Sequence, residues 1–270
     1  MTSTIVINAR MNNLKIAILP LSIEWGNKDK NFETVTSMMQ SLEPDTDVVV
    51  LPELFSTGFI PDKDMMADVA EPLSGRTLQF VRDLAARYNV GIAGSFLAGV
   101  GGLYFNRGFF VEPSGEETIY DKKHLFSLSR ESSLMASGND HPAVVRFRGW
   151  NLALIVCYDL RFPVWCRNHG LAYDAMLVPA NWPVSRGYAW KHLLIGRAIE
   201  NQSYYVGADR GGEDDYGQYD GMAMVMDYEG KPIGETRGHG FVYAVLERDK
   251  IDASRQRFTA WRDADEFNIL

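Results

Sequence analysis

The sequence predicts an α/β protein with two facing sheets between two layers of helices, a four-layer α-β-β-α sandwich. Segments with strand patterning alternate with segments of helical spacing, which is typical of α/β folds. The strands are almost continuously apolar, so both faces of each sheet must be covered. The strings DVVVLP (47–52) and DAMLVP (174–179) occupy corresponding places. We therefore expect two pseudo-equivalent halves that bury their sheets against each other.

The first half is predicted from apolar runs, helical spacing and turn residues. Between residues 29 and 42 the apolar side chains recur at the spacing of one helix face, and Pro113-Ser114-Gly115 is a turn sequence. Ser74 is a plausible N-cap for the second helix. The expected elements are a strand at 14–19, a helix at 29–42, a strand at 47–51, a helix at 75–88, a strand at 90–96, and a hairpin from 109–111 to 118–120.

The second half repeats this order. Its longest helix is expected at 187–201, and its hairpin turns at Tyr228-Glu229-Gly230. The expected elements are a strand at 151–156, a short helix at 163–169, a strand at 174–178, the helix at 187–201, a strand at 204–208, and a hairpin from 223–226 to 231–234. We expect a single domain over residues 1–270, with a core at about 14–246 and a tail at 251–270 whose aromatic residues could form a subunit contact or fold back on the core.

Composition and charge argue against several classes of protein. The 270 residues carry 27 Lys and Arg against 35 Asp and Glu, a formal net charge of −8, which disfavours nucleic acid as a partner. The N-terminal segment MTSTIVINARMNN is short and polar, and no stretch approaches the roughly 20 apolar residues that span a bilayer. Two cysteines are too few for a disulfide scaffold. We expect a cytosolic protein that does not bind membranes.

No metal site is expected from the sequence. The five histidines, at positions 124, 141, 169, 192 and 239, are scattered without the spacing of metal ligands. Cys157 and Cys166 do not form a C-x-x-C pair.

Cys157 is a candidate nucleophile because it directly follows the apolar run 152–156. A cysteine at such a corner can expose its sulfur beside backbone N–H groups that stabilise negative charge on a carbonyl oxygen. Taken alone, a cysteine after an apolar run is more often a small buried hydrophobic residue than a nucleophile.

Glu53 and Lys122 also follow strands. Glu53 lies between Leu51-Pro52 and Leu54-Phe55, in apolar surroundings that suit a group that takes and returns protons. Lys122 follows the hairpin strand, where alternation directs one lysine of the pair Lys122-Lys123 inward. Separately, each residue also fits an ordinary solvated loop.

Together, three strings resemble the signatures of the carbon–nitrogen hydrolase (nitrilase) superfamily. They are Leu51-Pro52-Glu53, the string YDKKHLF at 120–126, and the string CYDLRFP at 157–163. The resemblance extends from about residue 14 to 246. It implies the α-β-β-α sandwich and a catalytic set of Glu53, Lys122 and Cys157, with Glu131 as a second glutamate that supports the lysine.

The chemistry suits this set. A thiol with an ordinary pKa of about 8.5 needs a base or a cation to become a thiolate. Glu53 can accept its proton, while Lys122 and a backbone N–H near Tyr158 can stabilise the oxyanion. We expect hydrolysis of a small amide through a thioester, with no metal or organic cofactor. Asp159 and Arg161 are expected to brace the corner by an ion pair, and His124 to be structural.

Two further strings resemble the bacterial ω-amidase branch, which hydrolyses 2-oxo acid amides such as 2-oxoglutaramate. They are LPELFSTGF at 51–59 and ANWP at 180–183. We expect a small pocket with Phe55 and Trp182 as walls, Tyr158 beside the nucleophile and Arg186 as the cation for the substrate carboxylate. Core packing of Trp182 and a solvated Arg186 are the structural alternatives.

Other functions remain open from the sequence. They are an aliphatic amidase, an N-carbamoyl hydrolase, a nitrilase, and a non-enzymatic scaffold with an inert Cys157. A papain-like site would need His169 or His192 held against the sulfur, and nothing in the sequence marks either as oriented. The resemblance also implies a homodimer or larger homo-oligomer.

Overall fold

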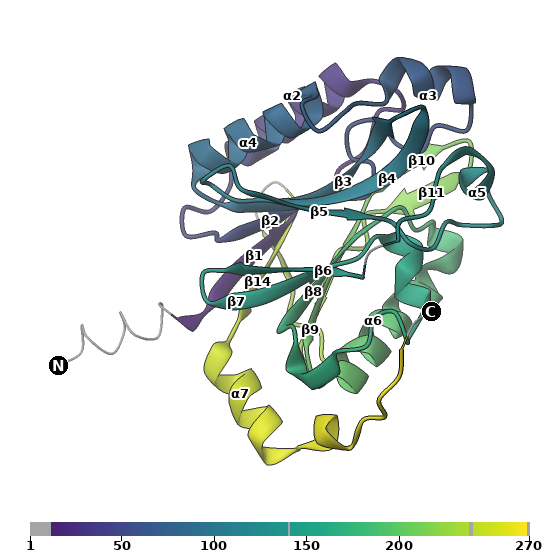
Figure 1. Ribbon diagram of the computed structural model, residues 1–270. Coiled ribbons are helices and arrows are strands. Elements are labelled where there is room, and N and C mark those ends of the chain that lie inside the picture. Colours follow the sequence, from purple (N-terminus) through teal and green to yellow (C-terminus); the bar gives the residue numbers. More distant parts are fainter. Residues whose placement is uncertain (1–11, 140, 238–239, 269–270) are drawn as a thin grey trace.

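Two large sheets lie face to face, with helices outside each of them, as predicted (Figure 1). The computed structural model describes residues 12–139, 141–237 and 240–268, so most of the N-terminal segment and His239 lie outside the described residues. The first sheet has the order β13 (Glu235–Arg237), β14 (Phe241–Leu246), β1 (Leu14–Ile18), β2 (Val48–Val50), β3 (Gly91–Val100), β4 (Leu103–Val111) and β5 (Glu117–Asp121). The second has the order β12 (Met224–Met226), β9 (Tyr204–Asp209), β8 (Ala175–Ala180), β7 (Trp150–Leu154) and β6 (Ala143–Phe147).

Helices form the outer layers. α2 (Lys28–Met39) and α4 (Arg76–Tyr88) cover the first sheet, and α6 (Gly187–Asn201) covers the second (Figure 1). α7 (Arg248–Arg257) follows β14. Within the described part of the chain, no helix combines the length and apolarity needed to cross a membrane. The remaining elements are α3 (Lys63–Val69), α5 (Glu131–Leu134), the hairpin β10 (Gly211–Asp214) and β11 (Gly217–Asp220), and the 3₁₀ helices η1 (Cys157–Arg161), η2 (His169–Leu171), η3 (Val184–Arg186) and η4 (Ala260–Asp263).

Strand alternation produces the layering. In β1, Ile16 and Ile18 point into a central core shared with the second sheet. Ala17 points the other way, into a separate core with Phe32 of α2 and Leu78 of α4. An apolar strand thus supplies both cores, which explains why these strands show no polar face. The predicted four-layer sandwich is confirmed.

The two halves are equivalent in topology. β1, β2 and β3 are parallel and are flanked by antiparallel β14 and β4. In the other sheet β7, β8 and β9 are parallel and are flanked by antiparallel β6 and β12. The two matched aspartates act alike, since Asp47 accepts from the Lys15 N–H at 2.8 Å and Asp174 from the Asn151 N–H at 2.9 Å.

Three local predictions are wrong. The helix expected at 163–169 is absent: residues 163–166 form turns, and 3₁₀ helices lie before them at Cys157–Arg161 and after them at His169–Leu171. Ser74 does not cap α4. Gly75 is the N-cap residue, and the buried Glu71 carboxylate accepts from the Thr77 N–H at 2.8 Å.

The hairpin at 223–234 also differs from the prediction. Its turn is present, but the returning segment forms only an isolated bridge between Met226 and Pro232. Pro232 has no N–H to donate to a ladder. The chain then crosses to the first sheet, where β13 pairs with β14.

The C-terminal tail folds back on the second half. Gln202 donates to the Phe258 carbonyl at 2.8 Å and accepts from the Trp261 N–H at 3.3 Å. The Phe258 side chain remains largely exposed. A subunit contact at the tail therefore stays a prediction.

Candidate active site

Cys157 lies at a sharp corner between β7 and η1. Its φ is +47°, a left-handed conformation that a residue with a side chain adopts only when its surroundings impose it. Such outliers concentrate at functional sites. The residue is 8% exposed, and the Asn181 N–H and the Glu53 side chain are both within hydrogen-bonding reach of its sulfur. The Tyr158 N–H donates to no acceptor among the described residues.

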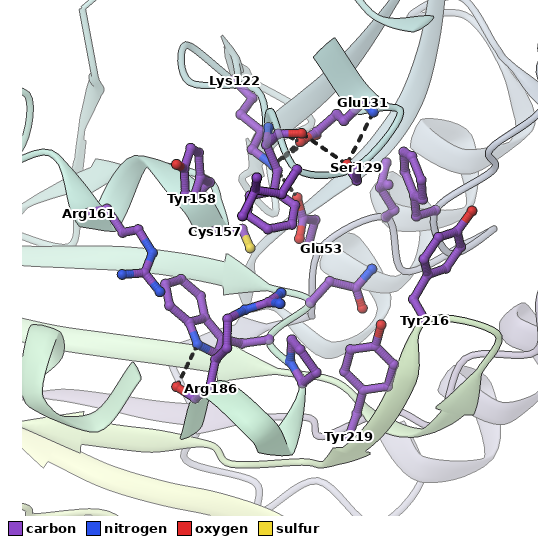
Figure 2. A pocket seen from close by; sticks show the side chains of 17 residues that line it. Glu53, Lys122, Ser129, Glu131, Cys157, Tyr158, Arg161, Arg186, Tyr216 and Tyr219 are labelled. Carbon is purple, nitrogen blue, oxygen red and sulfur yellow. Dashed lines mark hydrogen bonds and ion pairs between the residues drawn. The ribbon is translucent and has the colours of Figure 1, made fainter. Parts of the chain in front are cut away.

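Beside Cys157 the ammonium group of Lys122 is held between two carboxylates (Figure 2). The Lys122 Nζ lies 2.8 Å from Glu53 Oε1, 2.8 Å from Glu131 Oε1 and 3.0 Å from Glu131 Oε2. All three side chains are 5% exposed or less. A buried cluster of one cation and two anions is stable only when its remaining polar atoms are also satisfied.

Asn106 completes that cluster. Its side-chain NH₂ donates to Glu53 Oε1 at 2.7 Å and to Glu131 Oε1 at 3.2 Å. Its carbonyl oxygen accepts from the Ser95 hydroxyl at 2.9 Å, and Ser95 Oγ accepts from the Leu54 N–H at 2.8 Å. The Glu53 carboxylate and its loop are thus both fixed to the first sheet. The sequence analysis did not identify Asn106, although a polar residue within the apolar strand β4 is a signal.

The loop that carries Lys122 depends on Gly138. The Gly138 N–H donates to the Lys122 carbonyl at 2.9 Å. A Cβ at this position would lie 2.0 Å from the Asp121 carbonyl oxygen, so the two segments can approach this closely only at a glycine. Glu131 begins the short helix α5, and its Oε2 also accepts from the Phe126 N–H at 2.7 Å.

The charges of the cluster shift the proton equilibria of its members. Burial, reinforced by the Glu53 carboxylate, raises the pKa of the Cys157 thiol well above its usual value, although the Lys122 ammonium opposes this. Burial alone would lower the pKa of the Lys122 ammonium, but the Glu131 and Glu53 carboxylates outweigh it and raise that pKa well above its ordinary value. Both shifts favour a neutral thiol beside a charged ammonium group in the resting site.

Asp159 braces the corner, but not through the expected ion pair with Arg161. Its fully buried carboxylate accepts from the Val156 N–H at 3.1 Å and from the Tyr120 hydroxyl at 2.7 Å. The His124 ring lies 2.8 Å from the same carboxylate and stacks on Phe162, so His124 is structural, as expected. Among the described residues, Arg161 forms no ion pair. The reason is that Asp159 points inward while Arg161 points into the cavity.

The cavity in front of Cys157 has a volume of about 260 Å³, which suits a small molecule. Of the predicted substrate-binding residues, Tyr158, Trp182 and Arg186 line it, as do the four predicted catalytic residues. Its lining residues are Glu53, Leu54, Phe59, Lys122, Phe126, Leu128, Ser129, Glu131, Cys157, Tyr158, Arg161, Asn181, Trp182, Pro183, Arg186, Tyr216 and Tyr219.

Phe55 is not a wall of this cavity. It is fully buried on the helix side of the first sheet, with its ring 6.2 Å from Phe32 and 6.0 Å from Phe109. The cause is the left-handed conformation of Leu54, with φ of +48°, which turns the chain immediately after Glu53. Strand alternation therefore does not apply across this turn, and Phe59 reaches the cavity instead.

The sequence analysis did not identify several other lining residues. Tyr216 and Tyr219 come from the β10–β11 hairpin, and Arg161 was given only a bracing role. The two tyrosines had no usable signal, because the hairpin is distant in sequence from every motif. Among the described residues, no three His, Cys, Asp or Glu side chains lie close enough together to hold a metal ion.

Residues 15–256 match the model of the carbon-nitrogen hydrolase family. The chain is 36% identical to the omega-amidase YafV of Yersinia enterocolitica over 96% of the chain and 100% of the relative. It is 28% identical to the 2-oxoglutaramate amidase of Bacillus subtilis, over 92% of the chain and 96% of the relative.

A solved structure shares the whole architecture. XC1258 from Xanthomonas campestris, described as a CN-hydrolase superfamily protein with an arsenic adduct in the active site, superposes with a TM-score of 0.88 at 33% identity. The match covers 95% of this chain and 99% of that one.

Proposed function

Because this chain belongs to the carbon–nitrogen hydrolase family, we propose that it is an amidase in which Cys157 is the nucleophile, Glu53 the general acid and base, and Lys122 the cation that stabilises the oxyanion. The observation that supports this proposal most directly is that these three groups come from three distant segments and line one cavity of about 260 Å³ (Figure 2). Glu131 is proposed to keep Lys122 charged and in place.

The first step transfers the thiol proton. Since burial and Glu53 raise the pKa of Cys157, the free enzyme holds the thiol and not the thiolate. Glu53 accepts this proton as the sulfur attacks the amide carbon, so charge moves from a carboxylate onto the substrate oxygen. That oxygen is then stabilised by Lys122, which remains an ammonium throughout, and by the unused Tyr158 N–H.

The second half of the cycle returns the proton. Glu53 protonates the leaving nitrogen, the C–N bond breaks, ammonia departs and a thioester on Cys157 remains. A water molecule that gives its proton to Glu53 attacks the thioester carbon. The C–S bond breaks, Glu53 returns this proton to the departing sulfur, and the carboxylic acid is released. Glu53 thus acts twice, as base and acid, while the thiol is regenerated.

The proposed substrate is a small 2-oxo acid amide such as 2-oxoglutaramate. The relatives named omega-amidase and 2-oxoglutaramate amidase support this choice. The cavity is small, and the guanidinium of Arg186, which lines it, can bind a substrate carboxylate. Both lining carboxylates, Glu53 and Glu131, are bound to Lys122, so neither is available for the ammonium group of a 2-amino acid. A 2-oxo group is therefore favoured over a 2-amino group.

Other amides, carbamoyl compounds and nitriles are the alternative substrates on the same site, and a non-enzymatic scaffold is the alternative of a different class. The proposal also includes a cytosolic location, because the nucleophile must stay a free thiol. Assembly as a homodimer or larger homo-oligomer belongs to the proposal as well. We propose no nucleic-acid or membrane partner.

The test measures ammonia release from a panel of amides headed by 2-oxoglutaramate. We expect Cys157→Ala to lose at least roughly 1000-fold in kcat while its unfolding temperature stays near that of the wild type. Cys166→Ala is the matched control, because Cys166 is fully buried away from the cavity, and it should retain activity. Near-normal turnover by Cys157→Ala would refute the mechanism.

Alkylation separates the enzyme from the scaffold. Iodoacetamide should modify Cys157 increasingly as the pH rises, because its pKa is raised, and should spare Cys166, whose pKa burial raises to about 12. Equal labelling of the two cysteines, or none, would favour the scaffold.

A further inference from the structure

We propose that the side-chain carbonyl of Asn181 is a further catalytic group, which accepts a hydrogen bond from the scissile amide nitrogen and orients that nitrogen for protonation by Glu53. The inference rests on the proposed amidase function and deepens it by assigning a residue to the leaving nitrogen. Asn181 directly follows β8, and its backbone N–H is within hydrogen-bonding reach of the Cys157 sulfur. The residue therefore lies beside the nucleophile.

The side-chain oxygen of Asn181 is buried without a hydrogen-bond partner. Among the described residues, three buried side-chain oxygens lack a partner, and the other two are the hydroxyl oxygens of Ser56 and Thr77. Of these three residues, Asn181 alone lines the cavity that contains Cys157. A buried carbonyl without a partner costs free energy, and a ligand that supplies an N–H donor removes this cost. The oxygen is thus an unused acceptor beside the nucleophile.

The backbone around Asn181 is fixed before any substrate binds. The Ala180 carbonyl accepts from the Glu53 N–H at 3.4 Å. The Trp182 N–H donates to the buried Asp209 carboxylate at 2.7 Å. Polar groups that are already in place when charge moves lower a barrier most, because they do not need to reorganise.

The carboxylate oxygens near the sulfur are already in use. Glu53 Oε1 accepts from Lys122 at 2.8 Å and from Asn106 at 2.7 Å. The two oxygens of Glu131 accept from Lys122 at 2.8 and 3.0 Å. The second Glu53 oxygen takes the thiol proton in the proposed mechanism. Within the described part of the chain, Asn181 is therefore the cavity residue whose buried oxygen is free to accept from an amide nitrogen.

The contact with Asn181 acts while the C–N bond breaks. An amide nitrogen is planar, and its lone pair is delocalised onto the carbonyl group, so it becomes basic only after the sulfur has attacked. The nitrogen is then pyramidal, and the Asn181 carbonyl holds one of its N–H groups so that the new lone pair faces Glu53. Glu53 gives its proton to that lone pair, the C–N bond breaks with its electrons moving to nitrogen, and the carbonyl double bond forms again.

The experiment compares two substrates that transfer the same acyl group to Cys157. Succinamate and monomethyl succinate both form the succinyl thioester, so they share the deacylation step and differ only in the leaving group. The ester oxygen carries no hydrogen and has nothing to donate to Asn181. The kcat/KM of each substrate, which reports on acylation, is measured from the succinate formed, with wild type, Asn181→Leu and Asn181→Ala.

For Asn181→Leu we expect kcat/KM for succinamate to fall roughly 10- to 100-fold, because a buried N–H of the substrate is left unpaired. The kcat/KM of monomethyl succinate and its inhibition constant against succinamate should change less than about threefold, since the ester loses no hydrogen bond. Asn181→Ala should show a smaller loss for succinamate, because a water molecule can replace the acceptor.

Asn12→Leu is the matched control. It removes the same amide group from an exposed position outside the cavity and should match the wild type for both substrates. The ratio of the two kcat/KM values does not depend on the concentration of folded enzyme, so the comparison holds even where a variant folds incompletely.

The outcomes separate this inference from the proposed function. Equal losses for the amide and the ester in both Asn181 variants would mean that the side chain acts on the carbonyl oxygen or only supports the cavity wall, and the inference would be overturned while the amidase stands. An unchanged kcat/KM for succinamate would overturn it as well. If the wild type releases ammonia from no amide, the proposed function itself fails.

Discussion

Replacing Lys122 by methionine tests the buried charge cluster most directly. The change retains the length of the side chain and removes an ammonium that makes three contacts of 2.8–3.0 Å with Glu53 and Glu131. The formal charge of the cluster falls from −1 to −2, and two carboxylates of 5% exposure or less lose their cation. Breaking a buried pair by removing one partner costs about 3–5 kcal/mol.

The cost should depend on pH in a defined direction. In the wild type the pKa of Lys122 is raised above its ordinary value of 10.5. Its contribution to the free energy of unfolding is therefore fully present below pH 10.5 and is lost only above that pH. This contribution should be nearly constant from about pH 5 to 8. In Lys122→Met, one buried carboxylate must take up a proton for the chain to fold. Stability should therefore fall as the pH rises from 5 to 8. A loss of about 3–5 kcal/mol corresponds to roughly 6–20 °C in Tm for a chain of this size.

Thermal unfolding followed by circular dichroism at pH 5 and pH 8 measures this effect, and ammonia release measures activity. Activity should fall at least roughly 100-fold, as for loss of one oxyanion donor. The double variant Lys122→Met/Glu131→Gln restores the cluster charge to −1 and should be more stable than Lys122→Met at pH 8, yet equally inactive. A Lys122→Met protein with wild-type Tm at pH 8, or a double variant less stable than the single one, would refute this account of the cluster.

Two further predictions concern the scaffold around the site. Gly138→Ala should destabilise the protein by about 1–3 kcal/mol and reduce activity, because its Cβ would meet the Asp121 carbonyl oxygen at 2.0 Å. Gly196→Ala should instead stabilise the protein by about 0.5–1 kcal/mol, because Gly196 lies on α6 with open space at its Cβ. Urea unfolding measures both variants, and a change of the same sign in their free energies of unfolding would contradict this prediction. For Asp174, burial alone would raise the pKa of the carboxyl, but Arg248, the Asn151 N–H and Arg255 lower it below its ordinary value of 3.8. The stabilisation that the Asp174 carboxylate provides is therefore present above pH 3.8 and is lost as the pH falls through its lower folded-state pKa. Asp174→Asn should lower the free energy of unfolding by about 1–3 kcal/mol at pH 7, and by progressively less below pH 3.8. Unfolding curves at pH 7, 4 and 3 with a constant difference from the wild type would be inconsistent with this.

The strands, the long helices and the order of the layers could be predicted because they depend on local patterns. Helical spacing within residues 28–39 and 187–201, and apolar runs ended by proline, require knowledge of only a few neighbours. The failures are also local in origin. Of the residues at 163–169 (PVWCRNH), only arginine is a strong helix former, and the cap of α4 comes from Glu71, which is outside the expected capping position.

The positions of the proposed catalytic residues could also be predicted from the sequence, because they depend on where the strands end. Glu53, Lys122 and Cys157 each follow a strand, and the ends of strands in two packed sheets can meet at one edge. Which side chain then points into the cavity could not be predicted. Leu54 and Cys157 both have left-handed backbones, and after such a residue the alternation of a strand no longer indicates direction. For this reason Phe55 was assigned to the cavity and Arg161 to an ion pair, and both assignments were wrong.

The sequence by itself determined the family, the four-layer architecture and the identity of the residues proposed for catalysis, because these depend on periodicity and on short strings whose members are neighbours in the chain. Only the tertiary structure decided how Asn106 satisfies two carboxylates, and that Tyr216, Tyr219 and Arg161 line the cavity. These features depend on contacts between segments far apart along the printed sequence, from 25 residues between Asn106 and Glu131 to 157 between Phe59 and Tyr216. Such contacts form only when the two sheets pack, and no local pattern encodes which side chains then share a cavity.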